Sequence, residues 1–132
     1  MKGFLLVTAI AEAGAGLGLL LLPATVLSLL LGIQGTSPEI VIVSRVAGAA
    51  LLAIGLICAL ASRDTGSPAL LGVLAGILLY GVVVAGVLGY AGGALELAGP
   101  ALWPAVVLHG VLAVWCIVCL RSAARHQTSG AR

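Results

Sequence analysis

Four long stretches of this sequence contain no charged side chain. In the chain of 132 residues they cover 13–38, 46–62, 65–95 and 97–120. Stretches of this length and composition are typical of transmembrane helices. Only 8% of the residues are charged, whereas about a quarter are charged in ordinary soluble domains. The sequence therefore predicts an all-α integral membrane protein, a bundle of four spanning helices, and excludes a soluble globular domain.

Serine followed by proline marks the start of two of these helices. Ser37-Pro38 and Ser67-Pro68 each place a capping hydroxyl before a proline at the first helical position. The predicted spans are 3–22, 39–62, 68–90 and 101–120 of a single domain, 1–121, and residues 122–132 form a polar, mobile cytoplasmic tail. Four spans use about 80 residues, so the remaining residues provide loops and a tail but no folded domain outside the membrane.

Pro23 follows four leucines and either ends the first span or kinks it. One straight helix of about 29 residues would measure about 43 Å, which exceeds a hydrocarbon core of about 30 Å. We therefore expect the span to end here, with residues 24–31 forming a short helix in the membrane interface. A steeply tilted, continuous helix is the alternative.

Lysine and arginine are distributed unevenly between the predicted loops. With the amino terminus inside, the cytoplasmic segments hold Lys2, Arg63, Arg121, Arg125 and Arg132, and the two outer loops hold none. Because cytoplasmic loops are enriched in these residues, we predict a multi-pass protein with both termini in the cytoplasm. The basic residues are scattered and aromatic residues are few, so membrane lipids are the expected partners and nucleic acid is not.

Four polar side chains are expected at membrane depth, one from each span: Glu12, Arg45, Tyr80 and His109. At a rise of about 1.5 Å per residue, all four fall between the midplane and the outer third of the bilayer. Alanines and glycines share their helix faces and let helices approach closely there. The sequence therefore predicts one intramembrane polar cluster, in which Glu12 pairs with Arg45 and the other two complete the hydrogen bonds.

Two interpretations of this cluster stay open. In the first, the ion pair is structural, because an unpaired charge in lipid is very costly. In the second, the same residues form a working site for a proton or a ligand, because ionisable groups inside membranes usually have a function.

The three cysteines lie toward the cytoplasmic ends of the second and fourth spans, where thiols stay reduced. Cys116 and Cys119 have C-x-x-C spacing, but no second pair or group of histidines completes a metal site. Together with Cys58 they are predicted to be small packing residues. His109 has no second histidine at its depth to complete a haem site, so no metal or cofactor is expected.

Glycines recur inside three of the spans, as Gly14, Gly16 and Gly18, as Gly48, and as Gly72 and Gly76. None follows a strand, so these glycines are not nucleotide-binding loops. They predict surfaces on which helices pack closely, within the bundle or, alternatively, between copies of the chain.

Several short motifs occur in a fixed order along nearly the whole chain. They are Ala11-Glu12-Ala13-Gly14 before a leucine run and Pro23, Ser44-Arg45-Val46-Ala47-Gly48-Ala49, Leu79-Tyr80-Gly81, Trp103-Pro104 and Leu108-His109-Gly110. In this the chain resembles small uncharacterised bacterial four-helix membrane proteins, broadly the DoxX-like proteins. The resemblance implies a four-helix fold in the bacterial inner membrane, with no defined activity and no catalytic residue to assign.

A glutamate in the first span after an alanine-rich stretch is also similar to the small multidrug resistance transporters. The aromatic substrate face of that family is missing around Glu12, and Arg45 and His109 depart from its pattern. These departures argue against antiport of bulky cations.

The predicted function is that of a non-enzymatic inner-membrane protein, an accessory or small-ligand-binding module with Glu12, Arg45, Tyr80 and His109 as its polar site. The alternative is a small proton-coupled transporter. In that hypothesis Glu12 alternates between its protonated and charged forms, and His109 relays protons at physiological pH.

Overall fold

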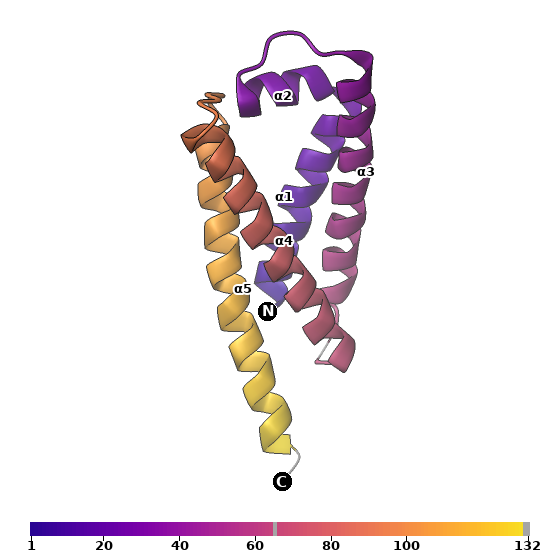
Figure 1. The fold of residues 1–132 in the computed structure, drawn as a ribbon. Coiled ribbons are helices and arrows are strands. Elements are labelled where there is room, and N and C mark those ends of the chain that lie inside the picture. Colours follow the sequence, from indigo (N-terminus) through magenta and orange to yellow (C-terminus); the bar gives the residue numbers. More distant parts are fainter. Residues whose placement is uncertain (65, 131–132) are drawn as a thin grey trace.

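The computed structural model describes residues 1–64 and 66–130, with side chains described up to residue 123. These residues form an all-α membrane bundle of five helices (Figure 1). The helices are α1 (Lys2–Leu21), α2 (Pro23–Leu31), α3 (Pro38–Ala61), α4 (Pro68–Gly93) and α5 (Leu102–Gly130). All except α2 are long and apolar enough to cross a membrane, which confirms the predicted fold class.

The serine-proline pairs begin helices as predicted. The Ser37 hydroxyl accepts a hydrogen bond from the amide of Ile40 at 3.5 Å, and Pro38 is the first residue of α3. The Ser67 hydroxyl accepts in the same way from the amide of Leu70 at 3.4 Å, ahead of α4. Each serine thus satisfies one of the amide groups that lack a partner in the first turn of a helix.

Pro23 separates two helices instead of kinking one. Leu22 has a non-helical backbone (φ −133°, ψ 54°) between α1 and α2, and α2 turns to lie across one end of the bundle (Figure 1). Gly32 ends α2 with a left-handed backbone, φ 72°, which glycine adopts without strain. The short helix predicted after the first span is therefore present.

The carboxyl-terminal segment differs from the prediction of a tail that begins at residue 122. The helix α5 continues without a break to Gly130. No proline interrupts this segment, and alanine and arginine are favourable helix formers, so the helix extends beyond the apolar span. The last residues of the predicted tail, 131–132, lie outside the described residues.

The four long helices pack as two pairs, α1 with α3 and α4 with α5, and the pairs contact each other much less extensively (Figure 1). The α1–α3 interface is built on glycine. A Cβ atom on Gly16 would lie 2.7 Å from the carbonyl oxygen of Gly48, and one on Gly55 would lie 3.0 Å from that of Ala9. Small residues thus bring the two backbones together, as predicted for Gly16 and Gly48.

The two pairs meet at the end of the bundle opposite α2. Phe4, Leu74 and Cys116 are fully buried there, and Phe4 makes an edge-to-face contact with Trp115, with ring centroids 5.7 Å apart. At the α2 end, the amide of Ala101 donates a hydrogen bond to the carbonyl oxygen of Leu29 at 2.8 Å. The pairs are therefore joined by a core at one end and by α2 at the other, with the polar residues between.

Candidate ligand site

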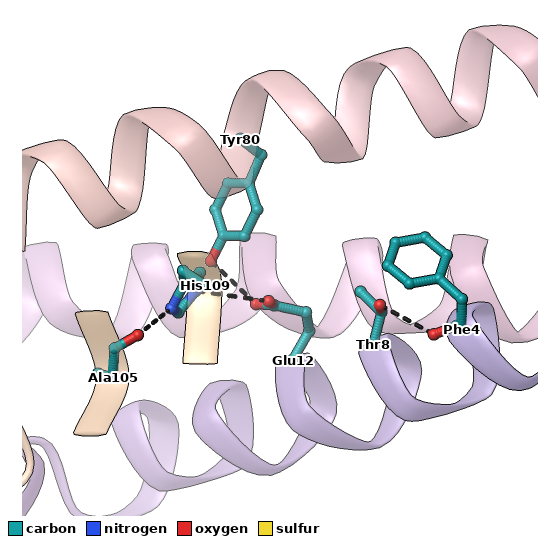
Figure 2. Close-up of polar contacts among 6 residues, drawn as sticks. All are labelled: Phe4, Thr8, Glu12, Tyr80, Ala105 and His109. Carbon is teal, nitrogen blue, oxygen red and sulfur yellow. Dashed lines mark hydrogen bonds and ion pairs between the residues drawn. The ribbon is translucent and has the colours of Figure 1, made fainter. Parts of the chain in front are cut away.

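Glu12 lies in the middle of α1 and is almost completely buried, with 3% of its surface exposed. Its neighbours Ala13 and Gly16 pack on α3. The Glu12 side chain points away from that interface, toward α4 and α5 (Figure 2). A carboxyl group at the centre of an apolar bundle therefore lies on the boundary between the two helix pairs.

Tyr80 of α4 and His109 of α5 reach Glu12 from the opposite pair (Figure 2). The Tyr80 hydroxyl donates a hydrogen bond to Glu12 Oε2 at 2.9 Å. His109 Nε2 lies 3.8 Å from Glu12 Oε1, and the Tyr80 and His109 rings meet edge to face. Three of the four side chains predicted for the cluster thus come together, from three helices.

The hydrogen bonding of His109 fixes which ring nitrogen faces Glu12. His109 Nδ1 lies 2.8 Å from the carbonyl oxygen of Ala105, one helical turn earlier. A carbonyl oxygen only accepts, so Nδ1 carries the proton. Nε2 is buried and has no hydrogen-bond partner among the described residues. In the neutral ring this nitrogen is an acceptor, and it faces a carboxyl oxygen.

Arg45 is the predicted member that the structure leaves outside the site. It is exposed, and it forms no ion pair with Glu12 in the described part of the chain. Because Gly48 contacts Leu19 and Leu20, Arg45 lies level with the end of α1. It is about 14 Å farther along the bundle than Glu12, or about two and a half helical turns. The structure therefore does not form the predicted Glu12–Arg45 pair.

The physical reason is the register of α1 against α3. Depth counted from the predicted ends of spans places both residues in one slab, but the glycine contacts set the true offset between the helices. Arg45 also lies next to Ser44, which is buried, so it occupies an outer face of α3. An arginine near the end of a span can extend its long side chain toward interfacial water.

A cavity of about 250 Å³ adjoins the three polar side chains. Apart from Glu12, Tyr80 and His109, its lining is apolar. Its large apolar wall side chains are Leu19, Val26, Leu30, Leu51, Val84, Leu88 and Leu108. The walls come from all five helices, and α2 contributes Val26 and Leu30 at the end that it covers. An apolar cavity with a few convergent polar groups is the usual form of a small-molecule site.

The cysteines take no part in this site. Cys58, Cys116 and Cys119 are buried free thiols, and the Cys116 thiol donates to the carbonyl oxygen of Leu74 at 3.2 Å, between α5 and α4. All three belong to the apolar core at the end opposite α2. Within the described residues no group of three acidic, histidine or cysteine side chains is placed to hold a metal ion.

Sequence reasoning missed two parts of the site. One is the carbonyl oxygen of Ala105, which orients His109; the spacing of one helical turn between the two residues is its only signal. The other is the contribution of α2, since the sequence places a helix after Pro23 but does not show what it covers.

The chain matches no protein-family model, no curated protein and no solved structure. The resemblance to DoxX-like proteins therefore stays a prediction, and the function rests on the geometry of the site.

Proposed function

We propose that this protein is a non-enzymatic membrane binding protein whose ligand is a small organic amine. The observation that carries the proposal is the pair of facing acceptors, Glu12 Oε1 and His109 Nε2, which lie 3.8 Å apart beside a largely apolar cavity. The other groups of the site are already engaged, Tyr80 with Glu12 Oε2 and His109 Nδ1 with Ala105. A ligand that donates hydrogen to both atoms therefore completes the site.

The burial of Glu12, with no lysine or arginine beside it in the part of the chain that the structure describes, supports a cationic ligand. A buried carboxylate is costly unless a cation or a proton neutralises it. Among the described residues, the group at ion-pair distance from Glu12 is the His109 ring, which is a cation only when both of its nitrogens carry a proton, and no lysine or arginine forms an ion pair with Glu12. A protonated primary amine supplies a positive charge and several N–H donors on one atom, so it can bridge both acceptors at once. The apolar walls then accommodate its hydrocarbon part.

The same proposal assigns the protein to the bacterial inner membrane, with membrane lipids as its surroundings and both termini in the cytoplasm. The even number of long helices among the described residues supports termini on one side, and in Figure 1 the start of α1 and the described end of α5 lie away from α2. The excess of arginine and lysine in the segments at that end supports the cytoplasmic side. Under this orientation α2 covers the site from the outer face.

Calorimetric titration of n-butylamine into the protein in lipid nanodiscs tests the proposal. Butylamine is protonated at neutral pH, as lysine is. We expect binding of butylamine, no binding of butyric acid, and affinity for butylamine lowered about tenfold or more by Glu12→Gln. Arg45→Gln is the matched control, since it also removes one intramembrane charge and lies outside the site. Equal affinity of Glu12→Gln and the unaltered protein contradicts the proposal.

Proton-coupled transport is the second candidate. A single proton between Glu12 Oε1 and His109 Nε2 satisfies the same two acceptors, so a proton and an amine compete for one place. The limited contact between the helix pairs favours this candidate, because their relative motion would open the site. In proteoliposomes, amine uptake driven by a pH gradient and abolished in Glu12→Gln indicates transport. Binding without uptake indicates a binding protein.

A further inference from the structure

A second apolar space lies between α3 and α4. This α3–α4 groove has a volume of about 550 Å³. Its lining includes Ile54, Ile57, Ala69, Gly72, Gly76 and Tyr80. It runs from the end of the bundle opposite α2 toward the polar site. Along α4, the distance from Ala69 to Tyr80 is about 16 Å.

The groove and the ligand cavity follow one another along the same two helices. Ile54 of α3 lines the groove, and Leu51, one turn closer to α2, lines the cavity. On α4, residues 69–80 line the groove, and Val84, one turn beyond Tyr80, lines the cavity. Tyr80 lines both spaces. Tyr80 therefore lies between the two spaces along α4.

Two glycines hollow out the groove. A Cβ atom on Gly72 or Gly76 would have no atom within 4 Å, and both residues are exposed. Gly16 and Gly48 differ in this respect, since a Cβ atom there would strike the backbone of the partner helix. The predicted packing role of Gly72 and Gly76 within the bundle is therefore not what the structure shows. Their missing side chains leave space that no part of the described chain fills.

We infer that the α3–α4 groove holds the single apolar chain of the ligand whose amine head binds Glu12 and His109. The ligand class is then a membrane-soluble, single-chain alkylamine that reaches the site from the bilayer, past Tyr80. This inference rests on the proposed function. The direct route past α2 is covered, because the Ala101–Leu29 hydrogen bond ties α2 to the segment before α5. The groove shares Tyr80 with the cavity that holds the polar site, so a hydrocarbon chain attached to a bound head would enter the groove past this residue.

Two glycine substitutions on α4 distinguish an effect of filling the groove from a general effect of adding leucine to this helix. Gly76→Leu fills the groove next to Tyr80. Gly86→Leu is the matched control, because Gly86 is also exposed, has no atom within 4 Å of a Cβ position and lines neither space. Gly72→Leu, one turn farther from Tyr80, fills the groove at greater depth and is the second variant if Gly76→Leu does not fold.

The measurement compares butylamine with dodecylamine in nanodiscs, with empty nanodiscs subtracted. In Gly76→Leu we expect the affinity for dodecylamine to fall about tenfold or more while that for butylamine stays within about twofold. We expect Gly72→Leu to lower the affinity for dodecylamine as well. We expect it to leave the affinity for octylamine unchanged, because the octyl chain is shorter. Gly86→Leu changes the affinity for none of the three amines.

The outcomes distinguish the inference from the proposed function. If Gly76→Leu and Gly72→Leu both bind dodecylamine normally while butylamine still requires Glu12, the groove inference fails and the proposed function stands. If butylamine does not bind the unaltered protein, both fail. If Gly76→Leu instead lowers the fraction of dimer in native mass spectrometry, a second copy occupies the groove and the inference is overturned. A bilayer lipid that copurifies with the protein and is lost in Gly76→Leu overturns it in the same way.

Discussion

Glycine has opposite effects at the interface within a helix pair and at the boundary between the pairs. Between α1 and α3, Gly16 and Gly48 bring backbones into contact, with no space for a methyl group at either position. Between α3 and α4, Gly72 and Gly76 contact nothing and leave the groove open. Glycine therefore closes the space between α1 and α3 and leaves open the space between α3 and α4.

The difference teaches that a glycine pattern in a membrane helix specifies a close approach only when a partner lies opposite. In lipid, helices associate through packing and hydrogen bonds and not through the hydrophobic effect, because the lipid chains are as apolar as the side chains. A hollow surface on a spanning helix is therefore open to any apolar partner. In this protein the between-pair boundary holds the polar site, the cavity and the groove, and the within-pair interfaces give rigidity.

The largest expected difference is between adding a methyl group in the α1–α3 interface and adding one in the α3–α4 groove. Gly48→Ala places a Cβ atom 2.7 Å from the carbonyl oxygen of Gly16, and we expect this overpacking to lower the free energy of unfolding by about 1–3 kcal/mol. Gly76→Ala meets open space and gains helix propensity, so we expect it to be neutral or to stabilise by up to about 1 kcal/mol. Unfolding in mixed detergent measures both. Equal destabilisation by the two variants contradicts the contrast.

The next effect concerns the hydrogen bond that crosses the boundary from Tyr80 to Glu12. We expect Tyr80→Phe to destabilise the protein by about 1 kcal/mol. We also expect a double-mutant cycle with Glu12→Gln to show coupling of about that size, because either change removes the same contact. Additive effects in the cycle indicate that the two side chains do not interact in the membrane.

A smaller and more local effect is expected where α2 joins the second pair. Ala101→Pro removes the amide that donates to Leu29, at a position just before α5 where proline is tolerated. We expect a loss of about 1 kcal/mol and faster hydrogen exchange in α2, with exchange in α3 unchanged. If exchange rises throughout the bundle, the α2 end is not a separate point of attachment.

The smallest effect is expected for Arg45, which lies neither in the α1–α3 interface nor at the boundary between the pairs. Replacing Arg45 by Met and Glu12 by Gln together should give the sum of the two single changes, within about 0.5 kcal/mol, because the residues are far apart and share no partner. The same unfolding assay measures this. A double variant that is more stable than the sum of the two single changes predicts, by more than about 0.5 kcal/mol, would indicate the ion pair that the sequence predicts.

The sequence predicts the helices and three of the four polar partners, because these features are local or depend only on depth. Ser37 and Ser67 mark helix starts, Pro23 separates α1 from α2, and Glu12, Tyr80 and His109 share a depth that a count of residues reveals. A count of residues places Arg45 at the wrong depth relative to Glu12. The offset of α3 against α1 is fixed by glycine contacts between the two helices, which neither helix specifies alone.

The open spaces are equally invisible in the sequence. The cavity and the groove depend on how far the α1–α3 pair stands from the α4–α5 pair, which is a property of the assembled bundle. Gly72 and Gly76 have the spacing of a packing motif, and only the position of α3 shows that nothing fills it.

The pairing of the helices also sets an order of events during synthesis. Both helices of the first pair precede α4 and α5 in the chain, so α1 and α3 can associate once both have entered the membrane, before the second pair is complete. At that stage the carboxyl group of Glu12 has neither Tyr80 nor His109 beside it. The protein passes through a period in which its most costly buried group has no partner, and that period ends only when the last helix has been inserted and folded against the rest.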